Sequence, residues 1–97
     1  MSIEGKIKIL VSDDDLTARI LMKETLASDT IEVLEAENGK RAIEQFEKHS
    51  PALLLLDVSM PEMNGFEVCE YIRAHEKGQH IPIIMVTGSD DLESIHK

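Results

Sequence analysis

Acidic residues stand at two places in this chain where an apolar segment stops. Asp57 ends a run of four leucines, and Asp13 and Asp14 follow directly after the apolar segment 6–12. Carboxylates that converge in one crevice repel one another and need a counter-charge, which oxygen-ligated Mg²⁺ supplies. An ionised aspartate beside such a cation can attack phosphorus and become an aspartyl-phosphate. The residue types therefore predict a divalent-cation site with a phosphoryl acceptor.

A hydroxyl residue follows a further apolar segment. Thr87 comes directly after 81–86 and is a candidate to hydrogen-bond a bound phosphoryl group. Each of these residues also has a simpler interpretation, because acids after a strand are often helix caps and threonine is common at strand ends. The four histidines show no spacing typical of a metal site and are expected at the solvated surface, and Cys69 is expected in the core.

The apolar segments alternate with helical patterns along the chain. Strands are expected over 6–12, 31–36, 53–57 and 81–86, with a helix after each of them. Such alternation predicts an α/β fold with a parallel sheet and right-handed crossovers. Ligands of such sheets bind beyond the carboxyl ends of the strands. The acids and Thr87 should therefore meet at one edge of the sheet.

Helical periodicity predicts which side chains meet the sheet. In the first helix the apolar face comprises Ala18, Leu21, Met22, Thr25 and Leu26, whereas Arg19, Lys23 and Glu24 should face water. In the second helix the apolar face comprises Ala42, Ile43 and Phe46. The third helix should bury Val68, Cys69 and Ile72 and end at Gly78, and a fourth should begin near Leu92. Before the third helix, Pro61 and Gly65 shape a loop.

Length and charge limit the possible functions. With 97 residues the chain should form one domain, and its formal net charge of -9 disfavours direct binding to nucleic acid or to an anionic membrane. The sequence contains no signal-peptide pattern and no apolar stretch of the roughly 20 residues that a membrane span requires. A cytoplasmic location is expected.

The combined motifs resemble the receiver domain of two-component response regulators. Four segments carry the resemblance: ILVSDDD at 9–15, ENGKRAIE at 37–44, LLLLDVSMPEMNGFEV at 53–68 and PIIMVTG at 82–88. It extends over essentially the whole chain, 1–97. The resemblance implies a doubly wound parallel sheet of the flavodoxin-like type and a role in signalling.

The resemblance also implies roles for individual residues. Asp57 would be the phosphoacceptor, receiving its phosphoryl group from a sensor histidine kinase or a phosphotransfer protein. Asp13, Asp14, Asp57 and the backbone carbonyl of Ser59 would bind Mg²⁺. Thr87 would be the switch hydroxyl. Recognition of the kinase would depend on surface side chains of the first helix, such as Arg19, Lys23 and Glu24.

The end of the chain departs from the family pattern. A receiver domain would continue through a fourth helix, a fifth strand with a lysine, and a fifth helix, so the domain is expected to be incomplete at its C-terminus. Without a fifth strand, the fourth strand would lie at a sheet edge and could pair with a second copy to form a homodimer. Two alternatives to a phosphoacceptor domain are a docking module that no longer signals and a Mg²⁺-dependent aspartyl-phosphate phosphatase. Catalysis beyond self-catalysed phosphotransfer and dephosphorylation is not expected.

Overall fold

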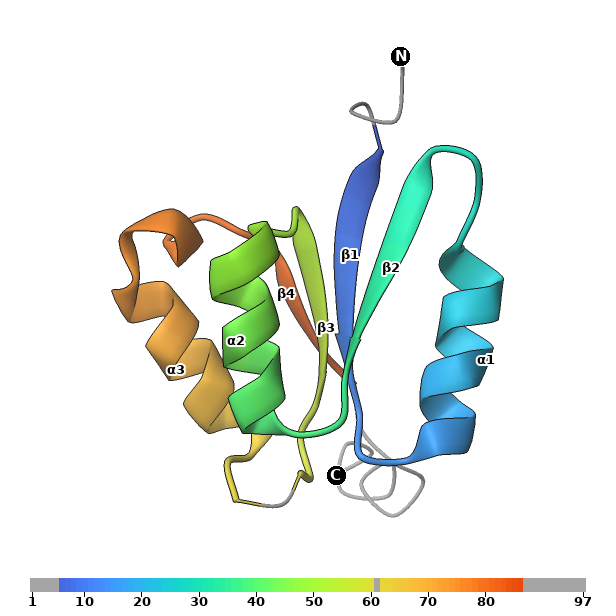
Figure 1. Ribbon diagram of the computed structural model, residues 1–97. Helices are drawn as coiled ribbons and strands as arrows, with labels where there is room; N and C mark the ends of the chain where they lie inside the picture. The colour runs from blue at the N-terminus through green and yellow to red at the C-terminus, as the bar shows by residue number, and fades with distance from the viewer. Residues whose placement is uncertain (1–5, 61, 87–97) are drawn as a thin grey trace, which may run out of the picture.

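A single parallel sheet forms the centre of the molecule. The computed structural model describes residues 6–60 and 62–86. In this part of the chain the strands are β1 (Ile7–Ser12), β2 (Ile31–Ala36), β3 (Leu53–Asp57) and β4 (Ile83–Val86). They are arranged in the order β2-β1-β3-β4, and all three pairings are parallel (Figure 1). The predicted α/β class and parallel sheet are confirmed.

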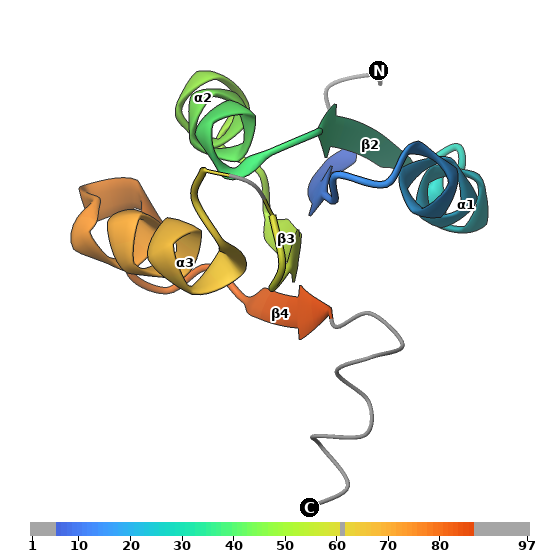
Figure 2. The ribbon, with the colours of Figure 1, turned by 90° about the horizontal axis from the view of Figure 1, so that it is seen from below.

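The helices lie on both faces of the sheet. They are α1 (Leu16–Leu26), α2 (Gly39–His49) and α3 (Gly65–Ala74), followed by the short 3₁₀ helix η2 (Glu76–Gly78). Figure 2 shows α1 on one face and α2 with α3 on the other, as right-handed crossovers require. None of the described helices has the length and hydrophobicity needed to cross a bilayer. The helix expected near Leu92 lies outside the described residues.

Two apolar clusters hold these layers together, because successive side chains of a strand point to opposite faces. The larger cluster lies between the sheet and the pair α2 and α3, and includes Phe46, Leu54, Leu56, Val68 and Ile72. The smaller cluster lies on the α1 face, where Ile9, Val11 and Val33 pack against Met22 and Leu26. The apolar core is therefore larger on the face that α2 and α3 cover than on the face that α1 covers.

A run of four leucines predicts a strand that is buried on both faces, and for β3 this prediction is only half correct. Leu54 and Leu56 are fully buried under α2 and α3, whereas Leu53 and Leu55 on the other face are half-buried. The reason is the position of α1, which contacts β1 and β2. On β4, at the edge of the described sheet, Ile84 is 51% exposed.

The predicted apolar face of α1 is wrong in part. Met22 and Leu26 pack against the sheet, but Leu21 and Thr25 are exposed. Arg19, which was expected to face water, is largely covered, with 12% of its side chain exposed. Compared with the predicted orientation, α1 is rotated so that Arg19 faces the sheet. There Arg19 forms an ion pair with Glu35 of β2.

The end of α3 also differs from the prediction. The helix ends at Ala74, and His75 has an extended backbone before the chain continues into η2, so the helix does not run to Gly78. His75 was expected at the solvated surface, but its ring packs edge-on against Phe46 at 5.3 Å between centroids. Its Nδ1 also accepts a hydrogen bond from the Lys77 backbone N–H. His75 therefore packs against the core.

Candidate functional site

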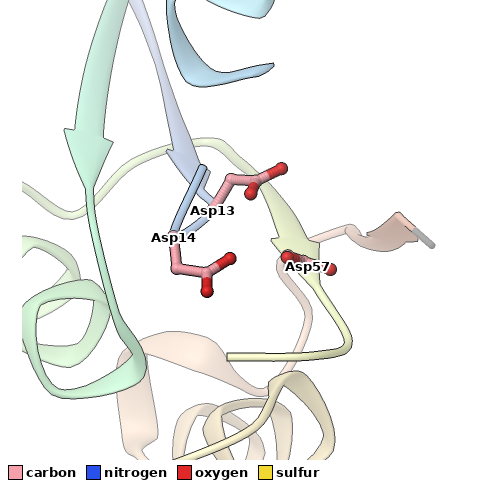
Figure 3. Close-up of side chains that lie close together, drawn as sticks. All are labelled: Asp13, Asp14 and Asp57. Carbon is pink, nitrogen blue, oxygen red and sulfur yellow. The ribbon is translucent and has the colours of Figure 1, made fainter. Parts of the chain in front are cut away.

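Three aspartates converge at the carboxyl edge of the sheet. Asp57 is the last residue of β3, and Asp13 directly follows β1. Because Ser12 pairs with Leu56, the two central strands end at the same level. One carboxylate oxygen from each of Asp13, Asp14 and Asp57 lies within 4.8 Å of the other two (Figure 3). The structure thus brings together the three carboxylates that the sequence singled out.

Burial strengthens the electrostatic interactions in this cluster. Asp13 is 7% and Asp57 8% exposed, whereas Asp14 is exposed. Burial raises the pKa of Asp57 to about 6; the backbone N–H of Ser59 opposes this rise, and the negative charges of Asp13 and Asp14 add to it. In the described part of the chain, no lysine or arginine forms an ion pair with any of the three carboxylates. The oxygen-only donor set and its uncompensated charge suit a hard divalent cation.

The loop after β3 is folded tightly against Asp57. The Ser59 backbone N–H donates to Oδ1 of Asp57 at 3.2 Å, and the Gly65 N–H donates to the Val58 carbonyl oxygen at 3.0 Å. A Cβ atom at Gly65 would lie 2.5 Å from the carbonyl oxygen of Asp57, so only glycine allows this approach. The start of α3 is fixed by a reciprocal capping box between Asn64 and Glu67.

The side chain of Asp13 makes a hydrogen bond within the loop after β1. Its Oδ1 accepts a hydrogen bond from the Asp15 backbone N–H at 2.9 Å. From their positions just before the helix, Asp14 and Asp15 are both candidates to cap α1. Asp15 occupies the N-cap position of α1, but its side chain makes no capping hydrogen bond. The acids after β1 therefore have different local roles.

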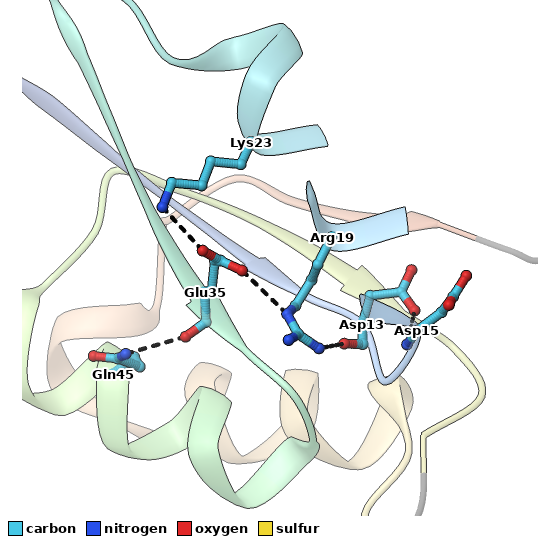
Figure 4. Close-up of polar contacts among 6 residues, drawn as sticks. All are labelled: Asp13, Asp15, Arg19, Lys23, Glu35 and Gln45. Carbon is cyan, nitrogen blue, oxygen red and sulfur yellow. Dashed lines mark hydrogen bonds and ion pairs between the residues drawn. The ribbon is translucent and has the colours of Figure 1, made fainter. Parts of the chain in front are cut away.

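Sequence reasoning missed a polar network beside Asp13 (Figure 4). Arg19 donates through Nη1 to the Asp13 carbonyl oxygen at 2.9 Å and through Nε to Oε1 of Glu35 at 3.2 Å. Lys23 contacts the other oxygen of Glu35 at 3.1 Å. The alternation of Ile31, Val33 and Glu35 along β2 would have placed Glu35 on the α1 face, which is the signal that was available.

Other predicted site features are not tested by the geometry. Thr87 lies outside the described residues, so its proposed contact with a phosphoryl group stays a prediction. The backbone N–H of Ser59 donates a hydrogen bond to the carboxylate of Asp57. The predicted role of the Ser59 carbonyl as a metal ligand also stays a prediction.

Comparison with known families gives a match over almost the whole chain. Residues 9–97 match the family described as the response regulator receiver domain. A putative response regulator from Chloroflexus aurantiacus has a similar structure, with a TM-score of 0.82 and 30% identity, covering 92% of this chain and 73% of that one.

Two curated relatives are much longer than the matched region. A probable transcriptional regulator ycf27 from Galdieria sulphuraria is 40% identical over 91 residues, which make up 94% of this chain and 34% of that protein. A protein named histidine kinase P4 from Formosa agariphila is 39% identical over 87 residues, which make up 90% of this chain and 6% of that protein. The matched region thus makes up 34% of the first relative and 6% of the second.

Proposed function

Because the chain belongs to the response regulator receiver domain family, we propose that it accepts a phosphoryl group on Asp57 in a Mg²⁺-dependent reaction. The observation that carries the proposal is the convergence of three carboxylates from the ends of β1 and β3 within 4.8 Å. Two of them are almost fully buried, in a place where a structural role would favour neutral side chains.

The cation would be held by Asp13, Asp14, Asp57 and the backbone carbonyl of Ser59. When bound, it supplies positive charge to the carboxylates and to the phosphoryl oxygens. The Ser59 N–H would keep the Asp57 carboxylate oriented. The hydroxyl of Thr87 would hydrogen-bond the transferred group and relay its presence to the neighbouring surface.

The proposed donor is the phosphohistidine of a sensor histidine kinase or of a phosphotransfer protein. A carboxylate oxygen of Asp57 attacks phosphorus, the P–N bond breaks, and the departing imidazole nitrogen takes up a proton. An acyl phosphate on Asp57 results. With a pKa of about 6, Asp57 is mostly ionised at neutral pH and can act as the nucleophile. The chain acts as a signalling acceptor in the cytoplasm and has no separate enzymatic substrate.

The first test is the intact mass of the protein after incubation with Mg²⁺ and acetyl phosphate. We expect one added phosphoryl group on the parent chain and none on Asp57→Asn or in the presence of EDTA. Circular dichroism should show that both proteins are folded. A folded parent that remains unmodified would contradict the proposal and favour a docking module, whereas sustained hydrolysis of phosphate esters would favour a phosphatase.

We also propose that β4 mediates a homodimer. Its support is the position of β4 at the edge of the described sheet, together with the 51% exposure of Ile84. An edge strand offers unpaired backbone groups to a second copy, although the net charge of -9 opposes association.

Sedimentation velocity is expected to show a concentration-dependent dimer that strengthens as salt screens the negative charge. Ile84→Lys should shift the protein to the monomer, and Ile20→Lys, which changes an exposed residue of α1, should leave the dimer unchanged. A parent protein that is monomeric at high concentration and high salt would refute this interface.

A further inference from the structure

We propose that Arg19 is a positioning residue of the acidic pocket, in which its guanidinium group, anchored on Glu35, fixes the main chain of Asp13. The inference rests on the proposed function, because it concerns the same pocket. Its basis is the pair of hydrogen bonds from one side chain, 2.9 Å to the Asp13 carbonyl oxygen and 3.2 Å to Glu35. With 12% of its side chain exposed, Arg19 is held between α1 and the sheet.

Arg19 makes one of three hydrogen bonds that hold Asp13 in place. The Asp13 backbone N–H donates to the Ala36 carbonyl oxygen at 3.0 Å, and its carboxylate accepts from the Asp15 N–H at 2.9 Å. The third contact, on the Asp13 carbonyl, comes from Arg19. The residue is therefore held at its amide, its carboxylate and its carbonyl, which sets the direction in which the carboxylate enters the pocket.

Glu35 is a suitable anchor because it is itself restrained. It lies in β2 opposite Val11 of β1, and Lys23 binds its second carboxylate oxygen. Its backbone carbonyl accepts a hydrogen bond from Gln45 of α2 at 3.1 Å. The hydrogen bond from Lys23, supported by Arg19, keeps the pKa of Glu35 below its usual value and its carboxylate charged.

The geometry requires arginine at this position. A guanidinium group presents donors in a planar fork and can reach Glu35 and Asp13 at the same time, whereas an ammonium group is a point donor. A positioning role of Arg19 and a simple effect of its charge predict opposite changes in Mg²⁺ affinity when Arg19 is removed. The positive charge of Arg19 repels Mg²⁺, so its removal alone would tighten binding, whereas loss of the fixed Asp13 geometry would weaken it.

The test is the Mg²⁺ affinity of the full chain, measured by isothermal titration at pH 7. Arg19→Ala is expected to weaken binding about tenfold, as for the loss of other groups that orient metal ligands. Arg19→Lys should restore only part of this affinity. Lys23→Gln removes one positive charge beside Glu35 but keeps a hydrogen-bond donor for its carboxylate, so the Mg²⁺ affinity of this variant should equal or exceed that of the parent.

A second readout needs no metal. Hydrogen exchange of the Asp15 amide, followed by NMR, should be faster in Arg19→Ala than in the parent and unchanged in Lys23→Gln. Unchanged exchange of this amide in folded Arg19→Ala would overturn the inference, as would Mg²⁺ binding as tight as that of the parent. If the parent binds no Mg²⁺, the proposed function fails, and the exchange experiment still decides the role of Arg19.

Discussion

Asp57→Asn is expected to stabilise the metal-free protein at pH 7 by up to about 3 kcal/mol. The pKa of this carboxyl group rises from 3.8 to about 6 on folding, mainly because it is buried. The folded state therefore binds more protons than the unfolded state between these two values, and the free energy of unfolding falls as the pH rises from about 4 to about 6. Asparagine keeps the shape of the side chain and removes the charge responsible.

Urea unfolding in EDTA, followed by circular dichroism across pH 3 to 8, would measure this effect. Below about pH 4, the free energy of unfolding should change with pH in the same way in the parent and in Asp57→Asn. Between about pH 4 and 6, the two curves should diverge. Asp29→Asn, which neutralises an exposed acid, should change the stability by less than about 0.5 kcal/mol. Equal stabilities of the parent and Asp57→Asn at pH 7 would show that Asp57 carries no buried charge.

Phe46→Ala is expected to lower the free energy of unfolding by about 3–5 kcal/mol. Phe46 is fully buried at the centre of the larger cluster, between α2 and the sheet, and its ring contacts His75 edge-on. Truncation would leave a cavity under the strand that carries Asp57. Such a loss is a large part of the roughly 5–15 kcal/mol that stabilises a typical domain.

Guanidinium chloride unfolding at pH 7 would test this prediction. Phe46→Leu retains most of the apolar volume and should cost less, on the order of 1–2 kcal/mol. Phe66→Ala is the matched surface control, because Phe66 is 59% exposed and its truncation leaves no cavity. If Phe46→Ala and Phe66→Ala had equal effects, the described core packing would be wrong.

The strands were predictable because their patterns are local. Leu53–Asp57 forms β3 with the predicted bounds, since an apolar run followed by an acid is recognisable without tertiary information. The orientation of α1 was not predictable in the same way. Leu16, Ile20 and Leu21 are apolar and yet exposed, so periodicity alone could not select the face that meets the sheet.

The candidate site could also be predicted from the sequence only in part. The convergence of Asp13 and Asp57 follows from a general property of parallel sheets, whose strands end at one edge. The contact between Arg19 and Glu35 depends on how β2 pairs with β1 and how α1 is rotated, and neither is contained in a local pattern. The contact of His75 with Phe46 was missed for a related reason, since it depends on how α3 packs against α2.

The pairing of β1 with β3 has a consequence for the order of folding. The two strands that supply the carboxylates are adjacent in the sheet, but more than 40 residues separate Ser12 from its partner Leu56. Contacts of such sequence separation form slowly, because a long loop must first close. We therefore expect the acidic pocket to assemble after the local β1–α1–β2 unit, and a ligand of this pocket to stabilise the native state chiefly by slowing its unfolding.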